Sequence, residues 1–302
     1  MAGDGAEFWS GDTAYLPGLS IGAPPDPLGP LGQVWGVPPP DPLAAEAAGH
    51  AGFAALIRAN MRHAAALRID HVLGLKRLFL VPDGARAGEG CYLAQPFEAA
   101  LGEIALESQR ARCAVVGEDL GTVPDGLREA MGASRILSYR VLWFEREARE
   151  FRPPANYPRL AAACVATHDI PTLAGWWEGA DIAEREALGL LDSAAAADAR
   201  AERAGERGTL LATLGLENHG EARLPPDVAA AIHAYVARTP SLMLLLQAED
   251  LAGERIGVNL PGTDRERPNW RHRMAPEAAS LCDSPLARAI LAAVAARRAT
   301  HL

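Results

Sequence analysis

Runs of apolar residues alternate with amphipathic stretches along most of this chain, and the alternation predicts a β/α fold. Short apolar runs indicate about five strands, at residues 67–70, 113–119, 135–142, 163–169 and 241–250. Stretches rich in alanine, leucine and charged residues predict helices at 45–66, 97–112, 124–131, 226–238 and 284–300, with two more between Ile182 and Ala212. Apolar strands separated by helices are typical of parallel sheets whose two faces are both buried.

Four of the predicted strands end in acidic residues. The acids are Asp70, the pair Glu118 and Asp119, then Asp169, and the pair Glu249 and Asp250. In a (β/α)8 barrel the active site is built from the carboxyl ends of several strands, which all face the same way. A single acidic strand end would fit a structural ion pair equally well. Because there are four, we expect these side chains to converge on one functional pocket.

The first 42 residues differ from the rest, because glycine and proline are dense in "PGLSIGAPPDPLGPLGQVWGVPPPDPL". Such a composition predicts little regular secondary structure. A disordered linker would normally lack tryptophan and leucine at this density. We therefore expect residues 1–42 to form an ordered surface loop with a function, as long ordered loops usually have.

The net charge and the cysteines indicate which partners and which cellular compartment to expect. The net charge of −9 argues against nucleic acid, since phosphate binding requires a basic face. Cys91, Cys113, Cys164 and Cys282 are widely separated, so we expect reduced thiols in a cytoplasmic protein. The opening "MAGDGAEFWSGD" does not resemble a signal peptide, and no apolar run approaches the ~20 residues of a membrane span. We expect no membrane partner.

A cluster of carboxylates with histidines suits two kinds of chemistry, metal-assisted hydrolysis and glycosyl transfer. A metal hydrolase would need a tight ligand set such as H-x-H or H-E-x-x-H, and neither occurs. The "THD" stretch, residues 167–169, could supply half of such a site. We favour glycosyl transfer and expect no metal and no cofactor.

Glycosyl transfer with retention needs one ionised carboxylate and one protonated carboxyl. Arg68 lies two residues before Asp70 in the same strand, so the two side chains share a face and the cation keeps Asp70 ionised. Glu118 has no neighbouring cation in the sequence, and the charge of Asp119 should raise its pKa. Asp70 is therefore the candidate nucleophile and Glu118 the candidate general acid/base.

Five motifs now give a family resemblance. "IGAPPDPLGPLGQVWGVPP", "LRIDHVLGL", "VVGEDLGTVP", "THDIPTLAGWW" and "NLPGTDRERPNWR" stand in the order and approximate spacing seen in 4-α-glucanotransferases. These are the amylomaltases, or disproportionating enzymes, of glycoside hydrolase family 77. The resemblance runs from about Gly5 to Arg273 and implies a (β/α)8 barrel that moves α-1,4-glucan segments between maltodextrins.

The resemblance also implies roles for individual residues. Asp70 would form the covalent glucosyl-enzyme, Glu118 would act as general acid/base, and Asp169 would be a third carboxylate that grips sugar hydroxyls. The implied substrate contacts are Asp26, Gln33, Trp35, Arg68, His168 and, as weaker candidates, Asn269 and Trp270. Trp176 and Trp177 could stack on sugar rings or pack in the core. The partners would be α-1,4-glucan donors and acceptors.

Alternatives remain open on the sequence alone. An α-amylase-type hydrolase shares the first half-reaction, and only the family resemblance favours transfer. A non-catalytic glucan-binding remnant is the alternative from another class.

The barrel is expected to be incomplete. The predicted strands do not reach eight, and none precedes residue 18. We therefore expect residues 1–302 to be the C-terminal part of a barrel catalytic domain, with residues 1–42 as a substrate-binding loop region within it. The chain would be a truncated gene product, a partial gene prediction or a cloned fragment. The N-terminal part of the same protein is then a further candidate partner.

Overall fold

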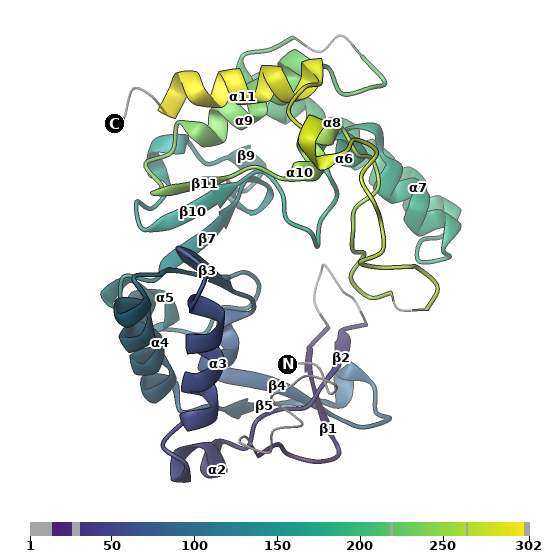
Figure 1. The fold of residues 1–302 in the computed structure, drawn as a ribbon. Coiled ribbons are helices and arrows are strands. Elements are labelled where there is room, and N and C mark those ends of the chain that lie inside the picture. Colours follow the sequence, from purple (N-terminus) through teal and green to yellow (C-terminus); the bar gives the residue numbers. More distant parts are fainter. Residues whose placement is uncertain (1–13, 26–30, 218–219, 264, 299–302) are drawn as a thin grey trace. The chain divides into compact units, whose positions relative to one another are not determined.

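The computed structural model of the 302-residue chain describes residues 14–25, 31–217, 220–263 and 265–298 (Figure 1). The chain divides into two compact units, Met1–Tyr139 and Arg140–Leu302. Each unit has its own hydrophobic core.

The five predicted parallel strands are present, which confirms the β/α class. In the first unit β3 (Ala66–Ile69) pairs in parallel with β6 (Ala114–Gly117), which pairs in parallel with β7 (Leu137–Val141). In the second unit β10 (Ala161–Cys164) pairs in parallel with β11 (Met243–Leu245). The strand order is β11-β10-β7-β6-β3. The described residues thus contain five strands of the parallel sheet, whereas a complete barrel of this class has eight.

Helices pack on the parallel strands of the first unit. These helices are α3 (Ala51–Met61), α4 (Phe97–Ala111) and α5 (Leu127–Ala133). In Figure 1, α3 and α4 lie side by side. Their buried side chains follow helical spacing, such as Leu101 and Ile104 on α4, and meet Val115 of β6 in one core. Burying a leucine or isoleucine side chain contributes about 1.5–3 kcal/mol each, and this fixes the strand ends that carry Asp70 and Glu118.

The single helix predicted at residues 45–66 is wrong. The structure has two helices, α2 (Pro42–Ala47) and α3, separated by Gly49 and His50. Both of these residues have left-handed backbone, with φ of 58° and 56°, which ends one helix before the next begins. The second helix ends at Met61, because Ala66 already belongs to strand β3.

The expectation of little regular structure in residues 1–42 is also wrong for its described part. β1 (Leu19–Ala23), β2 (Gln33–Val37), β4 (Arg77–Pro82) and β5 (Cys91–Ala94) form an antiparallel sheet in the order β2-β1-β4-β5. Gly22 allows β1 to approach β2 closely, since a Cβ atom there would lie 2.1 Å from the carbonyl oxygen of Gln33. The glycine and proline content thus accommodates close strand pairing and turns.

The second unit is mostly helical. Its helices are α6 (Leu173–Glu178), α7 (Ala180–Ala187), α8 (Ser193–Leu214), α9 (Pro226–Ala237), α10 (Ala248–Ala252) and α11 (Pro285–Arg298), and its remaining strands are β8 (Arg146–Glu147) and β9 (Glu150–Phe151). α9 and α11 pack against each other in Figure 1. Of the helices described, none combines the length and apolar character needed to cross a membrane.

Candidate active site

The register of β3 against β6 brings two of the predicted carboxyl groups next to each other. Ile69 pairs with Gly117, so Asp70 and Glu118 are the next residues on two neighbouring strands. Backbone hydrogen bonds continue past the strand ends: the amide of Glu118 donates to the carbonyl of Ile69 at 2.9 Å, and that of Val72 donates to the carbonyl of Glu118 at 3.0 Å. The backbone that carries both acids is therefore fixed.

Asp70 is accessible and paired with a cation. Nη1 of Arg68 lies 2.7 Å from Oδ1 of Asp70, and the Asp70 side chain is 67% exposed. The Arg68 guanidinium lies over the ring of Tyr139, 4.9 Å from its centroid, which limits where the cation can move. An exposed carboxylate paired with a positioned cation is suited to act as a nucleophile.

Glu118 has the opposite environment. The residue is 8% exposed, and its carboxyl accepts hydrogen bonds from the amides of His71 and Leu120, both at 2.8 Å. Burial raises the pKa of Glu118 and outweighs the two amide hydrogen bonds, which favour the ionised form. The charge of Asp70 also raises this pKa, while Arg68 lowers it. Asp70 and Glu118 thus differ in exposure and in charge partner, as is typical of a nucleophile and a proton donor in one site.

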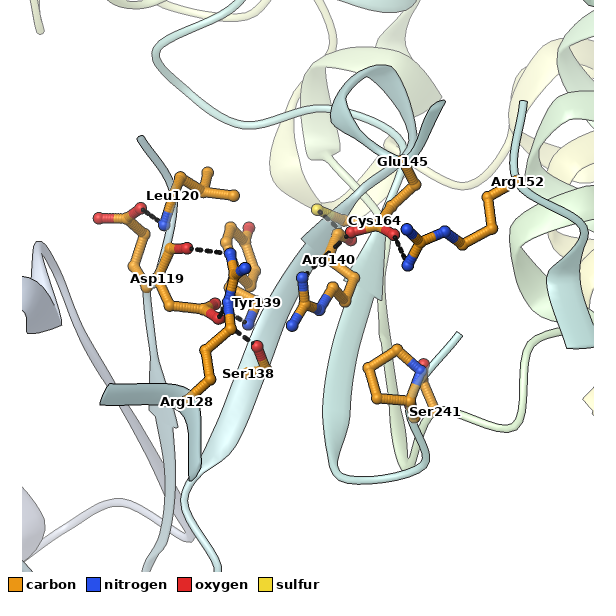
Figure 2. A network of polar contacts seen from close by, with 12 residues as sticks. Asp119, Leu120, Arg128, Ser138, Tyr139, Arg140, Glu145, Arg152, Cys164 and Ser241 are labelled. Carbon is orange, nitrogen blue, oxygen red and sulfur yellow. Dashed lines mark hydrogen bonds and ion pairs between the residues drawn. The ribbon is translucent and has the colours of Figure 1, made fainter. Parts of the chain in front are cut away.

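The sequence suggested that the charge of Asp119 raises the pKa of Glu118, but Asp119 is not among the groups that shift this pKa. Its carboxylate accepts hydrogen bonds from Nε of Arg128 at 2.7 Å, from the amide of Tyr139 at 2.8 Å and from the hydroxyl of Ser138 (Figure 2). The residue is fully buried. Asp119 therefore anchors β7 beside β6 through its hydrogen bonds, as a structural acceptor.

His71 is a component of the site that the sequence argument did not assign. Its backbone is left-handed, with φ of 47°, and burial lowers the pKa of its imidazole against the opposing charge of Asp70. The ring contacts Trp35 edge-on, with centroids 5.1 Å apart. Nε1 of Trp35 in turn donates to Oε1 of Gln33 at 3.1 Å. Two of the predicted substrate contacts therefore lie beside the "RIDH" segment.

The second unit contains the third predicted carboxylate. Nε2 of His168 lies 3.1 Å from Oδ2 of Asp169, and Nδ2 of Asn259 donates to Oδ1 of Asp169 at 2.7 Å. The amide of Asp169 donates to the hydroxyl of Thr167 at 3.2 Å. Asn259 was not singled out, although it begins the motif "NLPGTDRERPNWR". The carboxylate of Asp169 is thus oriented on both of its oxygens.

Several other residues considered as substrate contacts have hydrogen bonds or packing contacts within the protein. The side chain of Asn269 hydrogen-bonds within its own loop, to Leu260, Thr263 and Arg267. Trp176 and Trp177 are 5% and 2% exposed in the core, so packing is the correct one of the two readings given for them. Asp26 lies outside the described residues.

Glu249 and Asp250 were expected at the end of a strand, but strand β11 ends at Leu245. Glu249 and Asp250 lie in α10, and Asp250 is buried, where it accepts a hydrogen bond from the amide of Leu173 at 2.8 Å. Its second oxygen lies 3.7 Å from Nε2 of buried His233. Asp250 therefore connects α10 with the start of α6.

In the part of the chain that the structure describes, no group of three or more histidine, cysteine, aspartate or glutamate side chains is arranged to hold a metal ion.

Two carboxyl groups that follow adjacent parallel strands, one ion-paired and one buried, fit the two-carboxyl arrangement of enzymes that act on glycosidic bonds. Comparison with known proteins gives the family. A family model described as 4-alpha-glucanotransferase, of glycoside hydrolase family 77, matches residues 1–279. The chain belongs to this family.

Relatives agree with the family model. The chain is 38% identical over 283 residues to a 4-alpha-glucanotransferase of Haemophilus influenzae, covering 89% of this chain and 40% of the relative. It is 39% identical over 278 residues to one of Mycobacterium tuberculosis, covering 89% and 38%. The chain thus spans about two fifths of the length of the curated relatives it matches.

Solved structures support the fold. The amylomaltase of Corynebacterium glutamicum matches with a TM-score of 0.86 at 32% identity, over 97% of this chain and 44% of that protein. An amylomaltase of Streptococcus agalactiae in complex with acarbose matches with a TM-score of 0.75 at 18% identity, over 97% and 55%. The similarity confirms the predicted barrel-type β/α fold, of which the described residues contain a part.

Proposed function

We propose that this chain carries the reacting groups of a retaining 4-α-glucanotransferase, which moves α-1,4-glucan segments between maltodextrins. The observation that carries the proposal is that accessible, cation-bound Asp70 and buried Glu118 directly follow the paired last residues of β3 and β6. Neighbouring strands lie about 4.8 Å apart, so side chains that follow paired positions can bring their carboxyl groups to the ~5–5.5 Å separation of retaining enzymes. Membership of the 4-alpha-glucanotransferase family supports the same reaction.

In the first half-reaction, a carboxylate oxygen of Asp70 attacks the anomeric carbon of the donor glucan. The bond from that carbon to the leaving oxygen breaks, and this oxygen takes the proton of the Glu118 carboxyl. Burial raises the pKa of Glu118, which keeps this proton on the carboxyl to higher pH than in an exposed glutamate. The product is a glucosyl ester on Asp70, and Glu118 is left ionised.

In the second half-reaction, the 4-hydroxyl of an acceptor glucan attacks the same carbon. Glu118 accepts the hydroxyl proton as the ester bond to Asp70 breaks, which restores both carboxyl groups to their starting states. Water in place of the sugar would give hydrolysis. We infer transfer rather than hydrolysis from the family to which the chain belongs.

The remaining predicted contacts would bind and orient the sugar. Asp169, held by His168 and Asn259, would accept hydrogen bonds from sugar hydroxyls. Arg68 would hold Asp70 in place, and Trp35 and Gln33 would contact the glucan beside His71. The S. agalactiae amylomaltase, which has the same fold, is solved in complex with acarbose, and this supports a carbohydrate ligand. Asp26 and Asn269 remain candidate contacts.

The reaction is tested by incubating the purified chain with maltotriose. Transfer yields glucose together with a ladder of longer dextrins, whereas an α-amylase-type hydrolase yields only shorter sugars. Binding of maltodextrin without turnover would instead support a non-catalytic remnant, and would count against catalysis by this chain alone.

The covalent step has its own test. A slow 2-deoxy-2-fluoro-α-glucosyl donor should add one sugar mass to the protein, located by peptide mass spectrometry on Asp70. Asp70→Ala should remove this adduct, with Asp283→Ala as the control that keeps it. An adduct that persists in Asp70→Ala would refute the assignment of the nucleophile.

A cytoplasmic location and participation in maltodextrin and glycogen metabolism belong to the same proposal. The four cysteines are free thiols, which fits a reducing compartment.

A further inference from the structure

Arg112 and Arg135 have left-handed backbone at equivalent places before two neighbouring strands of the first unit. Arg112 lies two residues before β6 and Arg135 two residues before β7, with φ of 52° and 59°. Because β6 and β7 are parallel, both arginines lie at the amino ends of their strands. Glu118 follows the carboxyl end of β6. The two arginines are therefore at the opposite end of the strands from the candidate catalytic groups.

Each of these arginines follows the end of a helix. The amide of the residue after each arginine donates back into that helix, to the carbonyl of Ser108 in α4 at 3.1 Å and to that of Met131 in α5 at 2.9 Å. Glycine is the usual residue at the left-handed position of such a helix end, because it has no Cβ atom to strain the backbone. Backbone geometry thus does not explain why arginine occupies both positions.

The two arginine side chains line one cavity of about 400 Å³ in the first unit. Its polar lining comes from the end of α4 and from the turn before β7, and consists of Ser108, Gln109, Arg112, Ser134 and Arg135. Sites that bind small molecules usually have volumes of roughly 300–1,000 Å³. The cavity therefore has the size of a small-molecule site.

The rest of the lining is mainly apolar and well packed. Ile104, Val115 and Ile136 line the cavity and are each at most 3% exposed. They belong to the hydrophobic core of the first unit, so packing holds this part of the lining in place. A ligand in the cavity would meet an apolar surface as well as charged and hydroxyl groups.

The cavity is positively charged, although the chain as a whole has a net charge of −9. The residues that line it, all of them described, include no aspartate or glutamate. Arg110, two residues before Arg112, pairs with Glu107 at 2.7 Å. Within the described part of the chain, neither Arg112 nor Arg135 has an acidic partner of this kind. Both guanidinium groups are thus available to an anion.

We propose that this cavity binds a small phosphate monoester, with the phosphate on the two guanidinium groups and the organic part on the apolar lining. Guanidinium groups match phosphate oxygens in geometry and form short, charge-assisted hydrogen bonds with them. A phosphate monoester carries a charge of about −1.5 to −2 at neutral pH, which two arginines balance, whereas a carboxylate carries a single charge. The site goes beyond the proposed function, because it contains none of the groups that would act on glucan.

The test measures binding of phenyl phosphate to the full 302-residue chain by NMR, from the shifts of the backbone amide signals. The largest shifts should occur around Arg112 and Arg135. Inorganic phosphate lacks the organic part and benzoate has only one charge, so both should bind more weakly than phenyl phosphate. Equal affinity for inorganic phosphate would overturn the assignment of a monoester, and equal affinity for benzoate would overturn the preference for phosphate.

Substitution by glycine separates ligand binding from folding. Arg112→Gly and Arg135→Gly should each weaken the binding of phenyl phosphate by about tenfold or more, since each removes a hydrogen bond between charged groups. Their thermal midpoints should stay equal or rise, because glycine is unstrained at positive φ. Arg62→Ala removes an exposed arginine of the same unit that does not line the cavity, and should bind as the unchanged chain does.

Thermal unfolding gives a second measurement. Phenyl phosphate should raise the thermal midpoint of the unchanged chain, and should have little effect on the variant with both glycine substitutions. If the unchanged chain shows no saturable shifts, or if the folded glycine variants bind as tightly as it does, the cavity is not a phosphate site. Neither result bears on transfer from maltotriose, so failure of this inference is distinguishable from failure of the proposed function.

Discussion

The amide nitrogen of His71 lies 2.8 Å from Oε2 of Glu118, so the residue that follows Asp70 donates directly to the second carboxyl group. The backbone of His71 is left-handed at this position, with φ of 47°. The hydrogen bond links the "RIDH" and "GED" motifs, which are 47 residues apart in the chain. It also holds Glu118 in one orientation while burial keeps its pKa raised.

Replacing Glu118 by Gln should separate proton donation from the rest of the reaction. The variant cannot protonate a leaving oxygen, so transfer from maltotriose should fall by about 10²–10⁴-fold, the usual contribution of general acid catalysis. With α-maltosyl fluoride the leaving fluoride needs little proton donation, and formation of the ester on Asp70 should be largely kept. The pre-steady-state burst of fluoride release, which reports ester formation alone, is compared with the rate of transfer from maltotriose. Equal losses on both donors would remove Glu118 from the acid/base role.

The pKa of Glu118 should respond in opposite directions to two neighbouring changes. Asp70→Asn removes a negative charge that raises this pKa and should lower it, whereas Arg68→Ala removes a positive charge and should raise it. Burial remains in both variants, so both values should stay above that of an exposed glutamate. Carbon-13 NMR titration of labelled glutamate carboxyl groups measures each value, and shifts of the same sign in both variants would contradict the model of the site.

In the proposed reaction, the same pKa should set the pH dependence of the rate. Only the protonated carboxyl of Glu118 can donate to the leaving group, so kcat/KM should fall as the pH rises through the raised pKa. Arg68→Ala, if active, should move this fall to higher pH. A fall that stays in place while the titrated pKa moves would assign the alkaline limb to another group.

The sequence predicted the parallel strands and the placement of acids after them, because apolar runs and their ends are local features. It also predicted the raised pKa of Glu118 and the ion pair between Arg68 and Asp70, although for the pKa of Glu118 it named the wrong cause. The pKa of Glu118 is raised mainly by burial, and Asp119 is held by Arg128, Ser138 and Tyr139. Burial and these partners depend on packing between distant segments, which no local pattern reveals.

Two other differences have the same origin. The opening segment forms β1 and β2 because β4, about 60 residues later, supplies a strand to pair with. Asp250 follows an apolar run as Asp70 does, yet it lies in α10, where it binds the amide of Leu173. Both residues are aspartates that follow an apolar run. Whether such an aspartate lies at a strand end or is buried as a structural acceptor depends on tertiary contacts, which the local sequence does not show.

Asp119 should contribute strongly to stability. Asp119→Ala leaves the amide of buried Tyr139 without its acceptor and removes the partner of Arg128, which should cost about 3 kcal/mol. Urea unfolding followed by circular dichroism measures the loss. As a control, Asp283→Ala breaks the exposed pair with Arg288, 3.6 Å apart, and should change stability by less than about 1 kcal/mol. Similar effects of the two substitutions would contradict the anchoring role of Asp119.

Trp176 and Trp35 should behave in opposite ways when each is replaced by Ala. Trp176 is buried and stacks on Trp143 with ring centroids 4.3 Å apart, so its loss should destabilise the chain by about 3–5 kcal/mol. Trp35 is 39% exposed and contacts His71 edge-on, so its loss should change stability by less than about 1 kcal/mol and weaken maltodextrin binding instead. Urea unfolding and calorimetric titration with maltoheptaose measure the two effects on each variant. A stable Trp176→Ala, or a Trp35→Ala that unfolds while binding is unchanged, would reverse the assignment of packing and binding roles.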